Sequence, residues 1–243
     1  MRNTTKSLVL LLAGLSASPA LAGTKVGDLE INGNMTLASD YVWRGVSQSA
    51  RGPAVQGGIT VNHASGLYVG VWGSSIDFEN VSTASLEMDL FAGFTYEFPV
   101  GLKLDAGILH YDYPGADHAL ELDFEEYYLG ASYKYQALGM SGKYSYSPDY
   151  TGSPNSKSAY YLEGALTYDL PEGFVAAAHY GHTGGDFYNA LKPDNYNDYS
   201  VGVSKEVLGF VVDLSFYGTD SDGRTLFPRN ADDRVVFKVT KNF

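Results

Sequence analysis

The sequence predicts an all-β fold, an antiparallel up-and-down transmembrane β-barrel of twelve strands. Three observations predict it. Apolar residues alternate with polar or small residues over segments of about ten residues, tight turns alternate with longer polar connections, and aromatic residues gather near the segment ends. Such alternation gives each strand one face suited to hydrocarbon and one suited to water, as in the barrels of bacterial outer membranes.

Composition narrows the class further. The chain of 243 residues has no cysteine, which excludes a disulfide scaffold and a Cys-ligated metal site. Only 18% of its residues are charged while 20 are tyrosines, so the chain folds rather than remaining disordered. The 28 acidic residues outnumber the 16 basic ones, and without clustered Lys and Arg a nucleic-acid partner is excluded.

The first residues predict export. Arg2 and Lys6 precede an apolar run from Leu8 to Leu15, and small residues follow up to Ala22. This is the pattern of a secretory signal peptide over residues 1–22, cleaved near Ala22, and the apolar run is shorter than the roughly 20 residues that span a bilayer. We expect residues 23–243 to form the barrel in the outer membrane of a Gram-negative bacterium.

The alternation divides residues 23–243 into strands. In the first, Leu29, Ile31, Met35 and Leu37 form an apolar face opposite a polar one. In the third strand, the alternation does not decide which face contacts lipid: Leu67, Val69 and Val71, or Tyr68 and Trp72. The expected strands cover residues 28–43, 53–62, 67–74, 85–96, 102–111, 124–135, 140–147, 158–168, 174–183, 196–205, 210–218 and 234–243.

Two kinds of connection join these strands. Five are short, at residues 62–66, 97–101, 136–139, 169–173 and 206–209. Six are longer and polar, at residues 47–52, 74–85, 112–123, 148–157, 184–197 and 219–232. Tight periplasmic turns and longer outer loops alternate in this way in outer-membrane barrels, and the even strand number places both termini in the periplasm.

The aromatic residues predict two girdles at the membrane interfaces. The expected outer girdle contains Tyr41, Trp43, Tyr127, Tyr144, Tyr146, Tyr160, Tyr180, Tyr199 and Phe216. The expected periplasmic girdle contains Tyr96, Tyr135, Tyr168, Phe174, Phe210 and Phe243. A soluble β-sandwich is the alternative fold, but it would place its aromatic residues in mid-strand, within a core.

The last strand ends in an aromatic residue. Val235, Phe237, Val239 and Phe243 share its apolar face, which resembles the C-terminal signal recognised by the outer-membrane assembly machinery. Lys241 departs from that signal, but a lysine near the interface can extend its amine into water.

Two blocks of the sequence resemble a known family. The first runs over residues 37–49 and contains Tyr-Val-Trp-Arg-Gly, and the second, Gly-Leu-Tyr-Val-Gly-Val-Trp-Gly-Ser, runs over residues 66–74. They resemble the TorF-type porins, a family of proteobacterial outer-membrane proteins also filed as conserved hypothetical proteins. The resemblance extends over the mature chain and implies a barrel of this size with a pore role.

Charged residues of both signs are expected inside the barrel. Alternation predicts inward carboxylates at Glu30, Asp40, Glu87, Asp89, Asp105, Glu126, Glu163 and Asp213, and inward bases at Arg44, Lys103, Lys134, Lys143, Arg234 and Lys238. These groups could polarise a narrow water channel, or pair across the lumen and plug it. We expect the constriction or mouth at Arg44, Glu87, Asp89 and Asp105.

Arg44 carries two interpretations. It follows Asp40 by four residues, on the same inward face of an extended strand. It could contact an anion at the pore mouth, or pair with Asp40 or another lumen carboxylate and position the first loop; we favour pairing.

One outer loop is strongly acidic. Asp112, Asp117, Glu121, Asp123 and Glu125 occur with no Lys or Arg among them. The loop could concentrate cations at the mouth, bind divalent ions that bridge lipopolysaccharide, or simply be solvated.

No catalytic constellation emerges. His110 near Asp112 is the best His–carboxylate pair, and no serine lies in an elbow motif. We therefore expect no enzyme, cofactor or resident metal.

The sequence favours a channel for small polar solutes or ions with a weak preference for cations. The alternative is a non-conducting structural or adhesin-like barrel whose acidic loops bind divalent cations. The expected partners are membrane lipid, lipopolysaccharide, the assembly machinery and small polar solutes, and the oligomeric state stays open.

Overall fold

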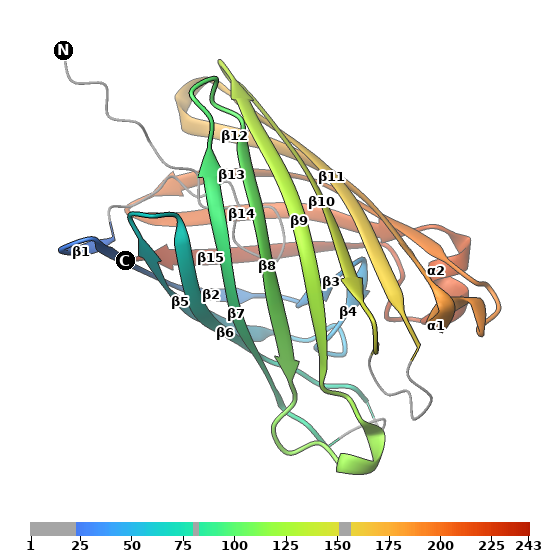
Figure 1. Cartoon of the computed structure of the whole chain (residues 1–243). Helices are drawn as coiled ribbons and strands as arrows, with labels where there is room; N and C mark the ends of the chain where they lie inside the picture. The colour runs from blue at the N-terminus through green and yellow to red at the C-terminus, as the bar shows by residue number, and fades with distance from the viewer. Residues whose placement is uncertain (1–22, 80–82, 151–156) are drawn as a thin grey trace.

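A computed structural model describes residues 23–79, 83–150 and 157–243, and the expected signal peptide lies outside these residues. Twelve antiparallel strands form a closed barrel (Figure 1). They are β2 (Leu29–Ala38), β5 (Ala54–His63), β6 (Leu67–Ser75), β7 (Leu86–Glu97), β8 (Lys103–Asp112), β9 (Phe124–Tyr135), β10 (Leu138–Ser147), β11 (Ala159–Asp169), β12 (Phe174–Gly184), β13 (Tyr196–Val207), β14 (Phe210–Thr219) and β15 (Arg234–Asn242).

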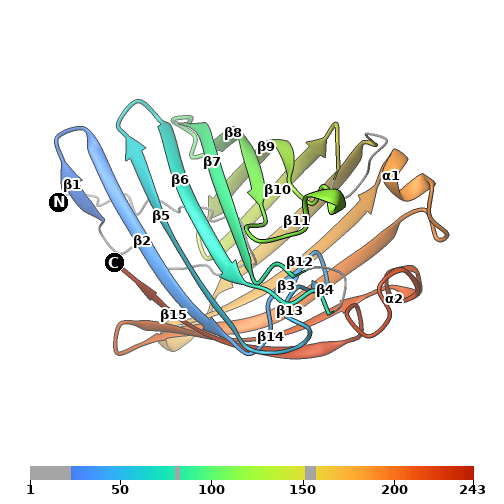
Figure 2. The same ribbon diagram turned by 90° about the horizontal axis from the view of Figure 1, so that it is seen from below.

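Each wall strand pairs with its neighbours in sequence, and β2 closes the ring by pairing with both β15 and β5. The short strand β1 (Thr24–Val26) forms a hairpin with the beginning of β2. Figure 2 shows the strands following one another around the ring. The closed ring pairs the backbone groups of every wall strand on both sides, which removes the exposed strand edges that lipid does not tolerate.

The two ends of the barrel differ as the sequence predicts. All five short turns lie at one end, here called the turn end, and all six longer connections lie at the other, the loop end. The loops carry the short helices η1 (His118–Leu120), α1 (Asp186–Asn189) and α2 (Ser221–Leu226), while η2 (Pro171–Gly173) forms a turn. Among the described residues, no helix is long and apolar enough to cross a membrane.

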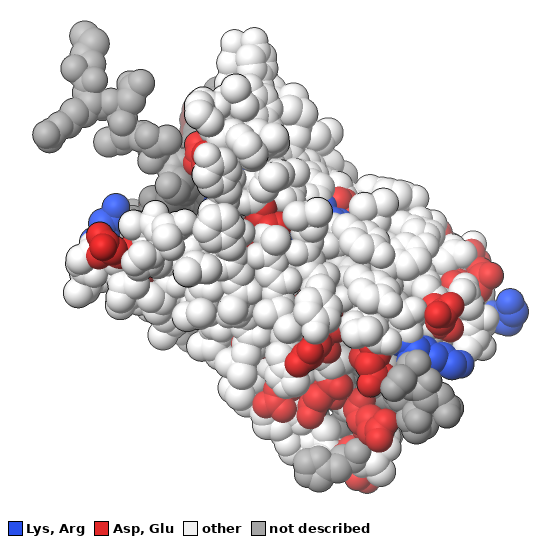
Figure 3. Space-filling model, viewed as in Figure 1, with Lys and Arg blue, Asp and Glu red and all other residues white. Residues whose placement is uncertain are grey.

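The outer wall is apolar. Figure 3 shows few charged side chains on the visible part of the wall, with acidic residues gathered over the loop end. The orientation of β6 is now decided: Leu67 and Val69 are 57% and 56% exposed on the outside, while Trp72 faces inward and is 7% exposed. Aliphatic residues exposed in this number indicate a wall that contacts lipid.

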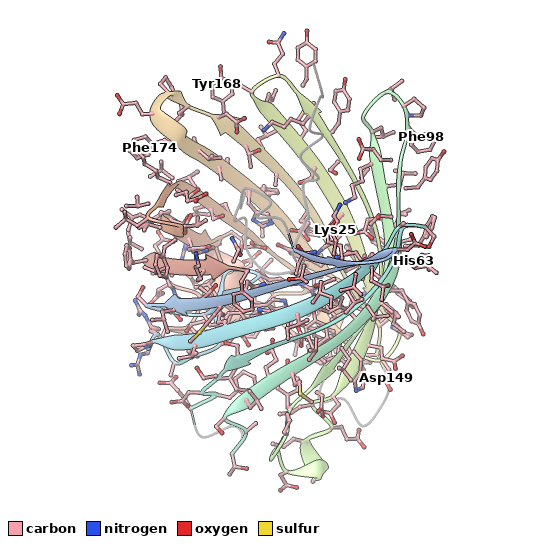
Figure 4. The ribbon with its side chains drawn as sticks, turned by 90° about the vertical axis from the view of Figure 1, so that its left-hand side faces the viewer. Lys25, His63, Phe98, Asp149, Tyr168 and Phe174 are labelled. Atoms are coloured by element: carbon pink, nitrogen blue, oxygen red, sulfur yellow. The ribbon has the colours of Figure 1, made fainter. Side chains whose placement is uncertain are left out.

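Aromatic residues point outward at both ends. At the turn end, all six residues of the expected periplasmic girdle are exposed, and Figure 4 shows Tyr168 and Phe174 projecting there, away from Asp149. At the loop end, Tyr127, Tyr144, Tyr146 and Tyr180 are exposed, and Tyr160, Tyr199 and Phe216 are partly exposed.

The prediction for the first strand is wrong at its outer end. The strand was expected to continue to Trp43, but β2 ends at Ala38 and the chain turns into the barrel, so the first connection begins at Ser39 rather than Ser47. Tyr41 is 4% exposed inside the lumen and does not belong to the girdle, and Trp43 packs inside against Tyr111. The alternation of apolar and polar residues continues through these positions, but their aromatic side chains are buried inside the lumen and do not face lipid.

Candidate functional site

The inward segment, residues 39–53, is called the plug loop. Its centre is a small hairpin of β3 (Val42–Trp43) and β4 (Val46–Ser47). Gly45 at the hairpin tip has φ +78°, and a Cβ there would collide with the side chains of Thr219 and Asp198 on the barrel wall. The plug loop therefore crosses the lumen and rests on strands far from its own in sequence.

Arg44 fixes the tip of the plug loop to the wall. Its guanidinium binds both carboxylate oxygens of Glu126 on β9, at 2.7 and 2.8 Å, and both side chains are about 95% buried. It also lies 4.2 Å from the ring centre of Trp43 and 4.3 Å from that of Tyr161. A bidentate, buried pair with two aromatic contacts holds the side chain in one position.

Asp40 fixes the base of the plug loop. Its carboxylate accepts hydrogen bonds from Arg234 Nη1 at 2.9 Å and from the hydroxyls of Ser47 and Ser49 at 2.6 and 3.0 Å. Asp40 and Arg44, four residues apart, thus bind different partners on different strands. Arg44 therefore pairs with another lumen carboxylate, as one form of the prediction has it, but not with Asp40. The form in which it pairs with Asp40 is wrong, because Gly45 and Arg44 turn the chain back at the hairpin tip instead of continuing an extended strand.

Tyr41 connects the plug loop to two buried acidic residues of β7. Its hydroxyl donates to Glu87 at 2.7 Å, and Asp89 lies two residues further along the same inward face. Burial, followed by the negative charge of Glu87 and of Asp89, holds the pKa of the Tyr41 phenol well above its usual value of 10. The phenol therefore remains a hydrogen-bond donor throughout the physiological range.

A second polar cluster lines the wall nearer the turn end. Lys143 and Glu163 form an ion pair of 2.7 Å, and His179 lies between Glu163 at 3.3 Å and Asp198 at 3.5 Å. The Tyr161 hydroxyl donates to Asp198 at 2.9 Å. Because the Tyr161 ring also faces Arg44, this cluster continues into the plug contacts.

The remaining predicted lumen residues are distributed around the ring. Asp213 pairs with Lys238 at 3.4 Å, and Asp105 accepts from the Tyr68 hydroxyl at 2.7 Å. Glu30 pairs with Lys25 of β1 at 3.4 Å. Lys103 is half-buried on β8, and Lys134 pairs with Asp169 at the turn end.

Exposure of the inward side chains changes along the barrel axis. At the loop end Thr183, Thr219 and Ser147 have no exposed surface, and Glu87 is 2% exposed. Toward the turn end, inward residues such as Ser141 and Thr167 are partly exposed. Among the described residues, the inward side chains are therefore more accessible to solvent toward the turn end, and the plug loop with its aromatic neighbours covers those near the loop end.

The residues of the predicted acidic loop do not form one site, and two of them, Asp112 and Glu125, lie within β8 and β9. Asp123 accepts from the backbone N–H of Tyr113 at 2.9 Å, and Asp117 accepts from that of Ala119 at 3.0 Å. Glu125 faces outward, 3.7 Å from Nδ1 of His110. Within the described ranges, no group of three or more His, Asp or Glu side chains is arranged to hold a metal ion.

Sequence reasoning did not place Asp198 and His179 among the charged groups of the lumen. Asp198 is 3% exposed and accepts from Tyr161, and His179 contacts two carboxylates. Alternation could have placed Asp198 inside, because the next residue, Tyr199, was assigned to the outer face. No pattern in the sequence indicates that His179 lies between Glu163 and Asp198, since that contact depends on the register of three strands.

The fold and the lumen define the class: a closed twelve-stranded barrel with the architecture of bacterial porins. The chain belongs to the family described as "Bacterial protein of unknown function (Gcw_chp)", whose model matches residues 22–243. That family does not carry the TorF name, so the resemblance to TorF-type porins stays a prediction. Among curated proteins, none matches this chain.

Solved porin structures share the fold at low sequence identity. The NanC porin is 11% identical, with a TM-score of 0.57 over 86% of this chain and 97% of its own. The KdgM porin, solved in complex with disordered oligogalacturonate, is 10% identical, with a TM-score of 0.55 over 88% of this chain and 97% of its own. An outer-membrane channel from Pseudomonas putida F1 is 12% identical, with a TM-score of 0.52 over 91% and 97% of the two chains.

Proposed function

We propose that this protein is an outer-membrane channel for small polar solutes or ions. One observation carries the proposal: a closed barrel has an apolar outer wall and a charged interior that is more accessible to solvent toward the turn end. Glu87 and Asp89 are acidic lumen residues outside the ion pairs with Lys and Arg among the described residues, so pairing across the lumen does not account for every charged group inside the barrel. The porin architecture of the similar structures supports the same function.

The proposal includes a location and an orientation. Residues 1–22 act as the signal peptide, and the apolar face ending in Phe243 presents the assembly signal. The turn end then faces the periplasm and the plug loop lies near the outer mouth, because short turns are periplasmic in barrels of this kind.

A weak preference for cations follows from the buried charges. Arg44, Arg234, Lys143 and Lys238 each pair with one carboxylate of the lumen. Glu87 and Asp89 are also buried inside, and within the described residues neither forms an ion pair with Lys or Arg. Where these two carboxyl groups are ionised, their negative charge on a narrow path favours cations over anions.

A non-conducting barrel is the second candidate, and the plug loop favours it. The two ion pairs that hold the loop are almost completely buried, at 5–6% exposed side-chain surface, so the loop end has no evident aqueous path around them. In this candidate function, the outer loops would act as an adhesin-like surface.

Planar-bilayer recording separates the two candidates. The refolded wild type is compared with a variant in which residues 40–52 are replaced by a short Gly-Ser linker joining β2 to β5. We expect small, discrete steps with a cation-leaning reversal potential from the wild type, and several-fold larger steps from the variant. If both proteins fold and insert yet stay silent, the channel function is wrong and the barrel is structural.

A further inference from the structure

Asp89 lies between two aromatic side chains on the lumen wall. Trp72 of β6 and Tyr111 of β8 are its direct partners in the strand registers on either side. Side chains directly opposite each other in this way are about 5 Å apart at Cβ. All three face inward and are buried, with 7%, 6% and 4% of their surface exposed for Trp72, Asp89 and Tyr111.

The plug loop covers this group with two more rings. Tyr41 meets Trp72 edge to face, with ring centres 5.5 Å apart, and Trp43 meets Tyr111 in the same way at 5.8 Å. The Tyr41 hydroxyl is engaged with Glu87, at 2.7 Å. The carboxylate of Asp89 is thus enclosed by aromatic side chains of the wall and the loop.

The hydrogen bonding of this region is incomplete at one atom. Oδ1 of Asp89 is buried and has no hydrogen-bond partner among the described residues. Arg44, the buried cation of the plug loop, is bound through both contacts to Glu126 instead. A buried carboxylate oxygen without a donor is costly, and native proteins satisfy nearly all such atoms, so this oxygen is free to accept a hydrogen bond from a bound group.

The enclosure selects the kind of cation. Metal ions need several convergent oxygen ligands, and no such group exists in the described part of the chain. An organic ammonium ion needs one or two carboxylate acceptors and the faces of aromatic rings, which attract it through their quadrupoles. Asp89, with Glu87 beside it and Trp72, Tyr41 and Tyr111 around it, offers that combination.

We propose that Asp89 and its aromatic neighbours form a binding site for a primary alkylammonium ion within the lumen. The inference deepens the proposed function, since it names a solute class for the channel, but binding itself requires no conduction. The ammonium group donates to Asp89 Oδ1 and its alkyl part packs on Trp72 and Tyr41.

Entry requires Tyr41 to move, and the plug loop has features that allow a second conformation. Three of its non-glycine residues, Arg44, Ala50 and Arg51, have φ of +48°, +50° and +64°. L-residues adopt this left-handed region only when surrounding contacts hold them there. In a second conformation of the plug loop, Tyr41 no longer covers the site.

Tryptophan fluorescence tests the proposal without any current. The chain has only two tryptophans, Trp43 and Trp72, and both border the site. The refolded protein is titrated in detergent with butylammonium chloride, with potassium chloride at equal ionic strength and with 1-butanol. We expect a saturable emission change with butylammonium alone, and at least a tenfold weaker response in Asp89→Asn.

Asp213→Asn is the matched control, because Asp213 is another buried lumen carboxylate but pairs with Lys238. This variant should respond as the wild type does. An Asp89→Asn response equal to that of the wild type overturns the proposal. So does a wild-type protein that responds equally to butylammonium, potassium and butanol, and this second test does not depend on the folding of any variant. A silent bilayer with a positive titration would refute conduction and leave the binding site standing.

Discussion

Arg44 illustrates how one side chain controls the loop end of the barrel. The guanidinium neutralises Glu126 of β9, covers the Trp43 ring and faces Tyr161 of β11, so two wall strands and the plug loop meet at one buried charge. Burying two charges is costly, and the pair is stabilising only while both partners and their hydrogen bonds are present.

Replacing Arg44 alone should therefore be more harmful than replacing the pair. We expect Arg44→Met to destabilise the docked plug loop by about 3–5 kcal/mol, because Glu126 is then buried without a cation. The double variant Arg44→Met/Glu126→Gln should recover most of that loss. Urea titration followed by tryptophan emission measures both, since Trp43 touches the Arg44 side chain.

Arg51→Ala is the control for this comparison. Arg51 pairs with Asp232 at 3.7 Å, but both side chains are over a third exposed, so its loss should cost less than about 1 kcal/mol. A double variant no more stable than Arg44→Met would contradict the role assigned to the charge pair.

Among the elements, the contact between β2 and β15 is the closing seam of the barrel. The register joins only five residue pairs, from Asn34–Asn242 to Ala38–Lys238. Beyond it, Gly33 and Phe243 exchange backbone hydrogen bonds of 2.7 and 3.0 Å, and the Phe243 ring lies over Gly33, where a Cβ would collide with it. Phe243 thus extends the shortest strand pairing of the barrel wall and covers Gly33 with its ring.

Gly33→Ala should open this seam. The added methyl group displaces the Phe243 ring, which we expect to lower stability by about 1–3 kcal/mol. Gly142→Ala is the control, because Gly142 also lies in a wall strand but a Cβ there meets its nearest neighbour, the Glu163 carbonyl oxygen, at an ordinary 3.5 Å. Heat-dependent gel migration of the two refolded variants provides the measurement, and equal unfolding temperatures would rule out the ring contact as the cause.

At the scale of the whole molecule, the loop end of the barrel presents an acidic surface. Acidic residues gather over the loop end in Figure 3, and Asp117, Glu121, Asp123 and Glu125 are all exposed there. Exposed charges of one sign raise the local concentration of counter-ions, and salt screens the effect.

Neutralising the acidic loop should change ion selectivity only at low salt. With Asp112, Asp117, Glu121, Asp123 and Glu125 replaced by their amides, the acceptor atoms that shape the loop remain. We expect the reversal potential to shift away from cations near 0.01 M salt, where screening extends over about 30 Å, and little at 1 M, where it extends over about 3 Å. A shift of the reversal potential that has the same size at both salt concentrations would contradict a screened surface effect and would indicate that these residues act inside the lumen.

The sequence by itself determined the wall of this protein. Strand alternation has period two, so the lipid-facing residues of β7, such as Leu86 and Leu90, and the inward Glu87 and Asp89 followed directly from the order of residues. The alternation of short turns with longer polar connections likewise predicted twelve strands and a barrel with a turn end and a loop end. These features depend on residues that are neighbours in the sequence, so the sequence alone is enough to predict them.

Only the tertiary structure decided what fills the lumen. Alternation continues from β2 into Tyr41 and Trp43 whether the chain meets lipid or folds inward, so the pattern could not distinguish a girdle from a plug. The partners of Arg44 and Asp40 lie 82 and 194 residues away, on strands brought together by closure of the ring. Pairing across a lumen depends on register and curvature around the whole barrel, which no local pattern contains.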